Sequence, residues 1–423
     1  MIAIGAPPQH LISLDFPIDQ EYHRLMQKAR RIIHRAYKFR LKATPEQTRQ
    51  FSQIAGVCRL VWNLCLEQRH LAYTVARKSL SSFSQLPEVT ALRKDYDWIE
   101  SVPSQVLQQK VRDLDAAYKN FFERRSDFPE RKKKGKSVDS FRFPQGFKID
   151  NRRVFMPKIG WVGFFKSQEI AGTPKHMTVS RNGKHWFVSI CCEVEQGIPT
   201  PKSKAVGIDM GIAKLCAMSD GTVIENPKIL LKYQKKLTKL QRRLVKKVKF
   251  SKNFYKAKAK ITALHTKIAN TRRDYTHKTT TEIAKNHGLV VIEDLRVKNM
   301  SASAKGSIHN PGKNVRQKSG LNRSILDAAW GEFRRQLEYK LDWAGGILIA
   351  VDPKNTSRKC PVCGHTAKEN RRTQSDFVCV ACGFADDADV NAAGNILRAG
   401  HARLACEVSG AVIPPAAGTL KAA

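Results

Sequence analysis

The sequence predicts a multidomain α+β protein, in which a small antiparallel β-barrel carries an inserted helical block and precedes an α/β domain with an inserted metal-binding module. Three observations predict this architecture. A single strand pattern precedes a long helical stretch, and several short aromatic and β-branched runs follow that stretch. Apolar strand patterns then alternate with helical segments, as is typical of α/β domains. Two Cys-x-x-Cys pairs interrupt the last strand-to-helix step.

The first predicted elements are a strand and the start of the helical block. In "HRAYKFRLKATPEQ", Tyr37, Phe39 and Leu41 alternate with basic residues, which predicts a half-buried strand. Thr44 followed three residues later by Gln47 has the pattern of a capping box. We therefore expect a helix to begin directly after this strand.

The helical block is predicted to end with an amphipathic helix in "SQVLQQKVRDLDAAYKNFFER", with Ser104 behind Pro103 as its N-cap. Its apolar face is formed by Leu107, Val111, Leu114, Tyr118 and Phe121. A basic linker follows, and short strands then run from "FRFPQGFKI" to "MTVSRNGKHWFVSICCEV". Asn182 and Gly183 are the clearest hairpin turn among them.

The predicted α/β domain opens with two strands in "AVGIDMGIAKLCAMSDGTVI". A basic helical hairpin follows, whose charges suit either a solvated coiled-coil face or phosphate contacts; their uniform sign favours the second. "HGLVVIEDL" and "GILIAVDP" are predicted buried strands, and "AAWGEFRRQLEYKLDWAG" is a predicted helix. We expect the polar, glycine-containing segment "SASAKGSIHNPGKNVRQKSGLNRS" to be mobile.

Charge is the main compositional feature. The chain has 423 residues, and 75 Lys and Arg against 37 Asp and Glu leave a formal net charge of +38 and an isoelectric point near 10.0. Such an excess favours a polyanionic partner, and we expect a nucleic acid. No apolar run reaches the roughly 20 residues of a membrane span, and the N-terminus lacks the pattern of a secretory signal. We expect a cytoplasmic, nucleoid-associated protein without a membrane partner.

The cysteine pairs predict one structural zinc ion. Cys360 and Cys363 form one Cys-x-x-Cys pair, and Cys379 and Cys382 form the other. Four thiolates leave no open coordination position, so this zinc would stabilise the fold without catalysing a reaction. The alternative is a set of redox-active or core cysteines. The other six cysteines are expected to be reduced thiols.

Three carboxylates predict a catalytic magnesium site. Asp209 lies in a strand, Glu293 ends a strand, and Asp389 heads a helix; together they resemble the acidic triad of the RNase H and RuvC fold. Two Mg2+ ions held by such carboxylates could promote phosphodiester hydrolysis. Taken singly, Asp389 could be a helix N-cap and Glu293 a solvated strand end. Neighbouring carboxylates could also replace members of the triad: Asp294, Asp386 and Asp387.

Taken together, the motifs resemble those of the TnpB family, transposon-encoded relatives of miniature type V CRISPR effectors. The resemblance runs in order through "YKFRLKATPEQ", "CRLVWN", "FRFPQG", "GIDMG", "RRDYTHK", "VIEDL", "CPVCGH", "CVACG" and "DVNAAGNIL". It implies an RNA-guided DNA endonuclease with an OB-like wedge barrel, an inserted helical recognition lobe and a RuvC-like nuclease domain that contains a zinc-binding module.

The resemblance also implies domain boundaries. The wedge would comprise residues 36–44 and 136–200, and the recognition lobe residues 45–135. The nuclease would comprise residues 201–354 and 385–404, interrupted by the zinc module at residues 355–384. Residues 1–35 would be an N-terminal extension of unknown role, and residues 405–423 a flexible tail.

For the site residues, the resemblance implies that Asp209, Glu293 and Asp389 hold two Mg2+ ions and that Cys360, Cys363, Cys379 and Cys382 hold zinc. It implies two partners, a guide RNA derived from the transposon end and target double-stranded DNA, bound by a monomer. Candidate nucleic-acid contacts in the recognition lobe and the "RRDYTHK" motif are Arg59, Gln105, Gln109, Arg272, Arg273 and Lys278. The alternatives are a nuclease-silent RNA-guided regulator, a transposase or accessory transposition protein, and a CRISPR-associated effector.

Overall fold

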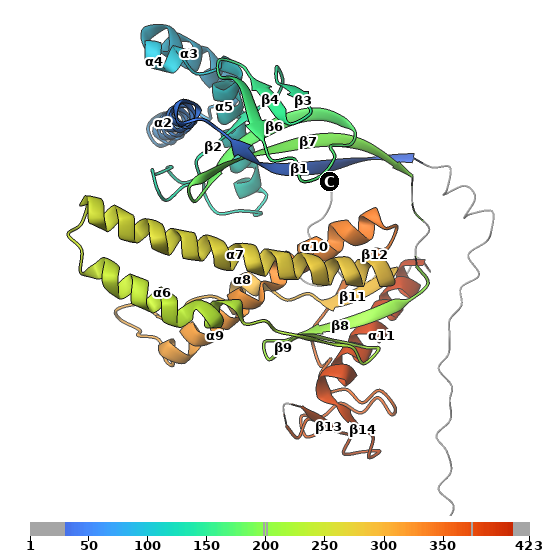
Figure 1. Ribbon diagram of the computed structural model, residues 1–423. Helices are drawn as coiled ribbons and strands as arrows, with labels where there is room; N and C mark the ends of the chain where they lie inside the picture. The colour runs from blue at the N-terminus through green and yellow to red at the C-terminus, as the bar shows by residue number, and fades with distance from the viewer. Residues whose placement is uncertain (1–29, 198, 200–201, 374, 409–423) are drawn as a thin grey trace, which may run out of the picture. The chain divides into compact units, whose positions relative to one another are not determined.

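The computed structural model describes residues 30–197, 199, 202–373 and 375–408 (Figure 1). The chain divides into two compact units, and each is described by itself. One contains residues 31–196 and 240–266, and the other contains the remaining described residues. Most of the expected N-terminal extension and most of the expected tail lie outside the described residues, as do residues 198, 200, 201 and 374.

The first unit is built on one seven-stranded sheet with the order β2-β6-β7-β1-β5-β4-β3. Strand β1 (Arg30–Lys42) lies inside this sheet, although four helices separate it in sequence from the other six strands. The helices are α2 (Pro45–Ala76), α3 (Ser82–Asp95), α4 (Asp97–Glu100) and α5 (Ser104–Phe122). The later strands are β2 (Ser140–Phe143), β3 (Lys148–Asp150), β4 (Arg153–Met156), β5 (Gly160–Phe164), β6 (Thr173–Asn182) and β7 (His185–Gly197).

Local sequence signals account for several boundaries in this unit. The capping box of α2 forms as predicted: the Thr44 hydroxyl accepts from the Gln47 amide, and Oε1 of Gln47 accepts from the Thr44 amide, both over 3.1 Å. The predicted turn joins β6 to β7, with Asn182 opposite His185 and Gly183 at φ +59°. Ser104, however, does not cap α5; it is already helical, and Pro103 occupies the capping position.

One hydrophobic core joins the helices of this unit to its sheet. Leu107, Val111 and Leu114 of α5 are fully buried, as the amphipathic pattern predicted, whereas Tyr118 and Phe121 are half-buried. From the sheet, Phe141 and Phe143 face the same core. The inserted helices are therefore anchored by apolar side chains to the sheet that they interrupt.

The second unit contains a five-stranded sheet with the order β10-β9-β8-β11-β12. Strands β8 (Ala205–Met210), β11 (Leu289–Glu293) and β12 (Ile347–Val351) are parallel, while β9 (Lys214–Met218) and β10 (Val223–Glu225) are antiparallel to their neighbours. A small ribbon is formed by β13 (Asp376–Val378) and β14 (Ala385–Asp387). The helices along this stretch of sequence are α6 (Ile229–Val245), α7 (Lys252–Asn286), α8 (Val297–Met300), α9 (Val315–Ala328), α10 (Trp330–Trp343) and α11 (Ala388–Val408). Residues 240–266, the end of α6 and the start of α7, belong to the first unit.

The segment expected to be mobile is in part a helix. Its second half forms the start of α9, and Ile325 and Ala328 in the last turn of α9 are buried. The expectation was wrong there because the anchoring apolar residues are concentrated at one end, which leaves the rest of the helix polar. The next predicted helix is divided at Ala329, whose φ of +57° separates α9 from α10.

Among the described residues, no helix is long and apolar enough to cross a membrane.

Candidate functional site

Asp209 and Glu293 lie at the carboxyl ends of two neighbouring parallel strands. In the pairing of β8 with β11, Ile208 lies opposite Ile292, and the two acidic residues come next on their strands. Side chains at matching positions of adjacent parallel strands project from the same face of the sheet. The register therefore brings these carboxylates together, although 84 positions separate them in the chain.

Helix α11 brings Asp389 to the same end of the sheet. This helix packs against β8 so closely that a Cβ atom added at Gly207 would lie 2.1 Å from the carbonyl oxygen of Ala393. Only glycine allows such an approach of strand and helix backbones. Asp389 stands in the first turn of α11, and its charge acts on Asp209.

Asp387, not Asp389, caps this helix. Oδ1 of Asp387 accepts hydrogen bonds from the amides of Asp389 and Val390, over 2.9 and 3.2 Å. These amides are among the first donors of the helix, which have no partner within it. The capping alternative for Asp389 is therefore excluded, and its carboxylate is available for another role.

The two strand-end carboxylates hold protons more tightly than ordinary acids. Burial raises the pKa of Asp209 to about 7, with further contributions from the charges of Glu293 and Asp389, while Arg371 acts in the opposite direction. Burial also raises the pKa of Glu293; a hydrogen bond from Thr356 opposes this rise and the charge of Asp352 adds to it. Clustered carboxylates with raised pKa values are typical of sites that bind cations or transfer protons.

Two cationic side chains that the sequence analysis did not identify contact the carboxylate cluster. Nζ of Lys214 lies 3.3 Å from Oδ2 of Asp387 and 3.6 Å from Oδ2 of Asp389. A guanidinium nitrogen of Arg371 lies 3.5 Å from Oδ1 of Asp389. Lys214 follows Asp209 on the antiparallel partner strand, so hairpin pairing could have indicated it. No sequence pattern pointed to Arg371.

The rival carboxylates differ from the triad in their contacts. Asp294 is ion-paired with Arg334. Asp386 is exposed and accepts a hydrogen bond from the amide of Asp387. Because Asp387 caps the helix and Asp386 faces solvent, while the charges of Glu293 and Asp389 both act on Asp209, the geometry favours Asp209, Glu293 and Asp389 as the candidate metal ligands.

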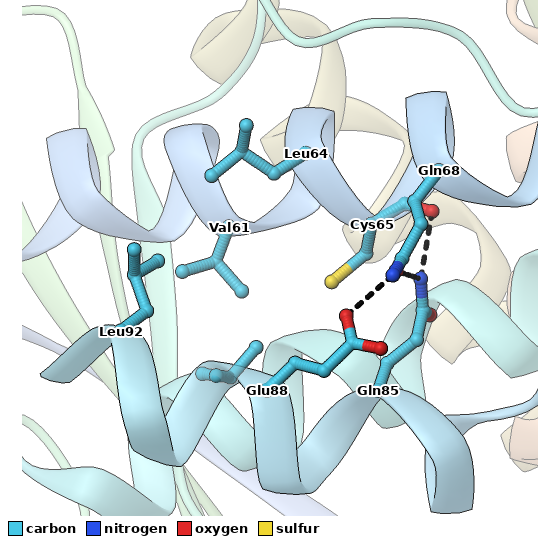
Figure 2. Close-up of a pocket in the computed structure, with 8 residues that line it drawn as sticks. Val61, Leu64, Cys65, Gln68, Gln85, Glu88 and Leu92 are labelled. Carbon is cyan, nitrogen blue, oxygen red and sulfur yellow. Dashed lines mark hydrogen bonds between the residues drawn. The ribbon is translucent and has the colours of Figure 1, made fainter. Parts of the chain in front are cut away.

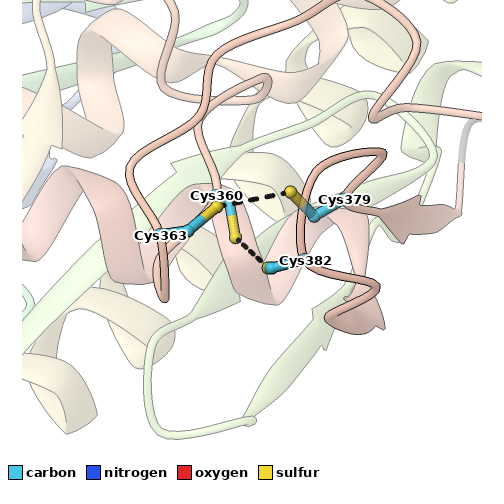
Figure 3. A group of neighbouring side chains, drawn as sticks. All are labelled: Cys360, Cys363, Cys379 and Cys382. Atoms are coloured by element: carbon cyan, nitrogen blue, oxygen red, sulfur yellow. Dashed lines mark hydrogen bonds between the residues drawn. The ribbon is translucent and has the colours of Figure 1, made fainter.

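The four predicted cysteines converge at a second site (Figure 3). Their sulfur atoms all lie within 4.8 Å of one another. The distance from Cys360 to Cys382 is 3.6 Å, and the distance from Cys363 to Cys379 is also 3.6 Å. A tetrahedral zinc site with bonds of about 2.3 Å places its sulfurs about 3.8 Å apart. The donor set and its spacing therefore fit zinc.

The two cysteine pairs sit on turns with the same backbone pattern. The Cys360 amide donates to the carbonyl of residue 365 and the Gly364 amide donates to the carbonyl of Cys360; Cys379 and Gly383 repeat this arrangement. Gly364 and Gly383 have φ values of +73° and +76°. Side chains other than glycine would strain both turns. The glycine after each pair thus shapes the turn that presents the sulfurs.

The carboxylates are less tightly gathered than the cysteines. Across the described part of the chain, the four cysteines are the one set of potential ligands whose donor atoms all lie within 4.8 Å. A pair of divalent ions about 4 Å apart would not require all three carboxylates to meet at one point. Hard oxygen donors also match the preference of Mg2+. The donor chemistry therefore fits the predicted magnesium site.

The candidate nucleic-acid contacts in the first unit are largely engaged within the protein. Arg59 forms an ion pair with Asp139, and its side chain is 14% exposed. Gln109 donates to Asp113 over 3.0 Å. Oε1 of Gln105 is buried and accepts no hydrogen bond from the described residues. Arg59 and Gln109 would have to exchange partners to contact a nucleic acid, and Gln105 would have to become exposed.

The candidates in the "RRDYTHK" motif lie on α7. Arg272 is ion-paired with Asp327, and Lys278 forms an exposed ion pair with Asp274 over 2.8 Å. Arg273 is exposed. On burial alone, Arg273 and Lys278 are better placed to meet a phosphate backbone than Arg272.

A pocket of about 270 Å³ lies between α2 and α3 (Figure 2). It is lined by both apolar and polar side chains. The Gln85 amide donates to Gln68 and to the carbonyl of Cys65, and Gln68 contacts Glu88. Because these polar groups already satisfy one another, the carboxylate and cysteine clusters are the stronger functional candidates.

Three family models match parts of the chain. A model described as a probable transposase matches residues 189–304, a Cas12f1-like TNB domain matches residues 330–396, and a helix-turn-helix domain matches residues 33–78. In this structure, residues 33–78 form most of strand β1 and the single long helix α2. The TNB match contains all four clustered cysteines.

The chain is similar to named proteins along most of its length. "Putative RNA-guided DNA endonuclease InsQ" of Escherichia coli (strain K12) is 49% identical over 376 residues, which cover 88% of this chain and 93% of the relative. A Streptomyces pristinaespiralis protein with the same designation, apart from InsQ, is 35% identical over 88% of this chain and 91% of its own length. The cryo-EM structure of a Cas12f1-sgRNA-target DNA complex shares the fold, with a TM-score of 0.53, 16% identity, and coverage of 86% of this chain and 98% of that one.

Proposed function

Because this chain belongs to the TnpB family of transposon-encoded proteins, we propose that it is an RNA-guided DNA endonuclease. The observation that carries the proposal is the convergence of Asp209, Glu293 and Asp389 at one end of the second unit's sheet. All three positions are carboxylates, and none of them caps a helix, because Asp387 is the cap of α11. The contacts of Asp389 with Lys214 and Arg371, at 3.6 and 3.5 Å, are long for ion pairs. In this proposal the three carboxylates supply the oxygen ligands that a metal-dependent nuclease would require.

We extend the proposal to the domain arrangement that the family resemblance implies. In this proposal the seven-stranded sheet is an OB-like wedge over residues 36–44 and 136–200, and the inserted helices at residues 45–135 form the recognition lobe. The five-stranded sheet belongs to a RuvC-like nuclease over residues 201–354 and 385–404. Residues 355–384 form the zinc module, inserted between the strand β12 and the helix that carries Asp389.

In the catalytic site, Asp209, Glu293 and Asp389 would hold two Mg2+ ions, which supply charge stabilisation to the attacking and leaving oxygens of a phosphodiester. The protein's own contribution is to position these carboxylates. The strand register aligns Asp209 with Glu293, and Thr356 holds one oxygen of Glu293 over 2.7 Å. Lys214 and Arg371 hold Asp389 from two sides. Asp209, whose pKa is about 7, must lose its proton before it can offer a metal ion its full negative charge.

The cysteine site would hold one structural zinc ion through Cys360, Cys363, Cys379 and Cys382. The first residues of the zinc module contact the helix that carries Asp389. The buried amide of Asn395, on the helix of Asp389, donates to the carbonyls of Thr356 and Lys359 over 2.9 and 2.7 Å. Zinc binding would thereby support the position of the catalytic helix.

The partners in this proposal are a guide RNA from the transposon end and target double-stranded DNA, bound by one copy of the protein at the nucleoid. Base pairing would read the target sequence, and the protein would read a short flanking motif. Arg59, Gln105 and Gln109 are proposed for the flanking motif, and Arg272, Arg273 and Lys278 for phosphates. The net charge of +38 supports binding to polyanions such as RNA and DNA.

The proposal is tested by cleavage of a plasmid library with a randomised flank, using protein co-expressed with its own genomic flanks and supplied with Mg2+. We expect cutting beside one short motif. Asp209→Ala and Asp389→Asn should abolish cutting while RNA binding remains. Asp387→Asn is the matched control, because asparagine also caps helices, and it should retain cutting.

Two outcomes would contradict the proposal. Cutting by the Asp209→Ala variant would remove the triad from the mechanism. Specific target binding without cutting, in protein with an intact triad and bound Mg2+, would instead support a nuclease-silent regulator.

A further inference from the structure

Helices α6 and α7 form a hairpin joined by a short turn (Figure 1), and large hydrophobic side chains in and beside this turn are exposed. Val245 is 85% exposed, Val248 79%, Phe250 76% and Tyr255 52%. We call residues 245–256 the hairpin tip. Side chains of this size rarely gather in the open on a soluble surface unless something covers them. The tip therefore has the character of a binding surface.

Two features of the backbone hold the aromatic rings of the tip in place. Ser251 caps α7: its hydroxyl accepts from the Phe254 amide over 3.1 Å. Directly before this cap, Phe250 has φ of +66°, a conformation that is strained for a bulky residue. The strain persists while the ring of Phe250 stays exposed, so this conformation presents the side chain instead of burying it.

A structural explanation of these residues would be a hydrophobic staple at the start of α7. In a staple, the residue before the cap packs against the fourth residue of the helix, which here is Tyr255, whereas Phe250 contacts the neighbouring Phe254. The ring of Phe250 lies 6.3 Å from that of Phe254, and Phe254 lies 5.7 Å from Tyr255. This contact leaves three-quarters of the Phe250 surface and half of the Tyr255 surface open. Packing between neighbouring rings thus explains why the rings contact one another, but it does not explain why Phe250 and Tyr255 are exposed.

The surroundings of the tip carry charge of one sign. Nine Lys and Arg residues lie between Arg242 and Lys260, and no Asp or Glu occurs between Glu225 and Asp274. A second copy of the chain would bring the same cations to its own tip and would be repelled. Aromatic rings among cations are the combination that binds single-stranded nucleic acid, because bases stack on the rings while the cations track the phosphates.

We propose that the hairpin tip binds an unpaired segment of RNA, with bases stacked on Phe250 and Tyr255 and phosphates held by the surrounding lysines. The inference rests on the proposed function in naming the guide RNA as the source of that segment. Unpaired RNA is the favoured occupant because its splayed bases expose their faces, whereas a duplex offers only its backbone to such a surface. Lys246, Lys247 and Lys249 lie in the turn beside Phe250 and are exposed.

The first test is the affinity of the full-length Asp209→Ala protein for an unstructured RNA of about 12 nucleotides, measured by fluorescence anisotropy without Mg2+. Phe250→Ala combined with Tyr255→Ala should weaken this binding about tenfold. Binding to an RNA duplex of the same length should stay within about twofold. The dependence on salt should be unchanged, because no charge is removed.

A matched control removes equally exposed aromatic rings elsewhere: Phe83 is 86% exposed and Tyr73 is 56% exposed. Phe83→Ala combined with Tyr73→Ala should leave RNA affinity within about twofold. Phe250→Trp, made in place of Phe250→Ala, should retain the affinity of the parent, since tryptophan stacks equally well. The thermal unfolding temperature of every variant should match that of the parent, because the substituted side chains are exposed.

Position is tested separately with the same RNA carrying 4-thiouridine. Crosslinks should map to peptides within residues 245–256. Equal loss of affinity for single- and double-stranded RNA, or crosslinks confined to other segments, would overturn the inference. An equal loss for DNA of the same sequence would assign the tip to a DNA strand and also overturn it. If the parent protein fails to cleave guided targets but its tip still crosslinks to RNA, the proposed function is wrong and the inference about the tip stands.

Discussion

The hydroxyl of Thr356 donates a hydrogen bond to Oε1 of Glu293 over 2.7 Å, across 63 positions of sequence. Thr356 is buried and lies just before the first cysteine pair, and its own carbonyl accepts from Asn395 on α11. One residue therefore links a strand-end carboxylate, the base of the cysteine module and the helix that carries Asp389. This is the physical connection between the two predicted sites.

Replacing Thr356 with valine should shift the pH dependence of cleavage. The hydrogen bond favours the ionised form of Glu293 and opposes the effect of burial on its pKa, so its loss should raise that pKa further. Because catalysis requires the ionised carboxylate, the acidic limb of the rate profile should move to higher pH by roughly one unit. Single-turnover cleavage between pH 5 and pH 9 measures this. Thr366→Val, in an exposed part of the same module, should leave the profile in place.

Asp209→Asn should stabilise the protein in magnesium-free buffer, and more so at higher pH. The folded-state pKa of Asp209 is about 7, raised from 3.8, so the folded state binds the proton more tightly than the unfolded state. Stability from this group is present below the unfolded pKa and is lost as pH rises toward 7. Asparagine removes that loss. The unfolding temperature at pH 7 should rise by about 2–6 °C relative to the parent, with little difference near pH 4. A constant difference at all pH values would contradict the assignment.

Gly207→Ala should separate α11 from β8 and impair cleavage. The added Cβ would lie 2.1 Å from the Ala393 carbonyl oxygen, and neither backbone can yield without displacing Asp389. We expect a loss of roughly 1–3 kcal/mol in the free energy of unfolding and more than tenfold in cleavage rate. Gly394→Ala is the matched control in α11: nothing lies within 4 Å of its added Cβ. It should stabilise the helix by about 0.5–1 kcal/mol and retain activity.

Metal analysis of freshly purified protein should find about one zinc per chain. Cys360→Ser or chelation should abolish that zinc and lower the unfolding temperature, because the metal holds together a module with only a small core of its own. Cys191→Ser, at a half-buried position outside the cluster, should retain the zinc. Zinc-free protein with an unchanged unfolding temperature would show that the four cysteines have another role.

Local chemistry explains how much of the structure was predictable. The capping box at Thr44 and the turn at Gly183 depend on neighbours within a few residues, and both form as expected. The four cysteines were recognisable because zinc requires pairs at short, regular spacing, and their sulfurs do converge. The helix α9 was missed because its few buried side chains are confined to its end.

The sequence by itself determined which residue types could form the sites: carboxylates at two strand ends and one helix start, and thiolates in pairs. Only the tertiary structure decided how these residues are placed. It made Asp387 the helix cap and left the Asp389 carboxylate outside the cap, and it brought Lys214, Thr356 and Arg371 to the carboxylates. The physical reason is range. Capping and metal-ligand spacing act over a few residues, whereas the shared environment of a cluster depends on strand register and helix packing between segments far apart in the chain.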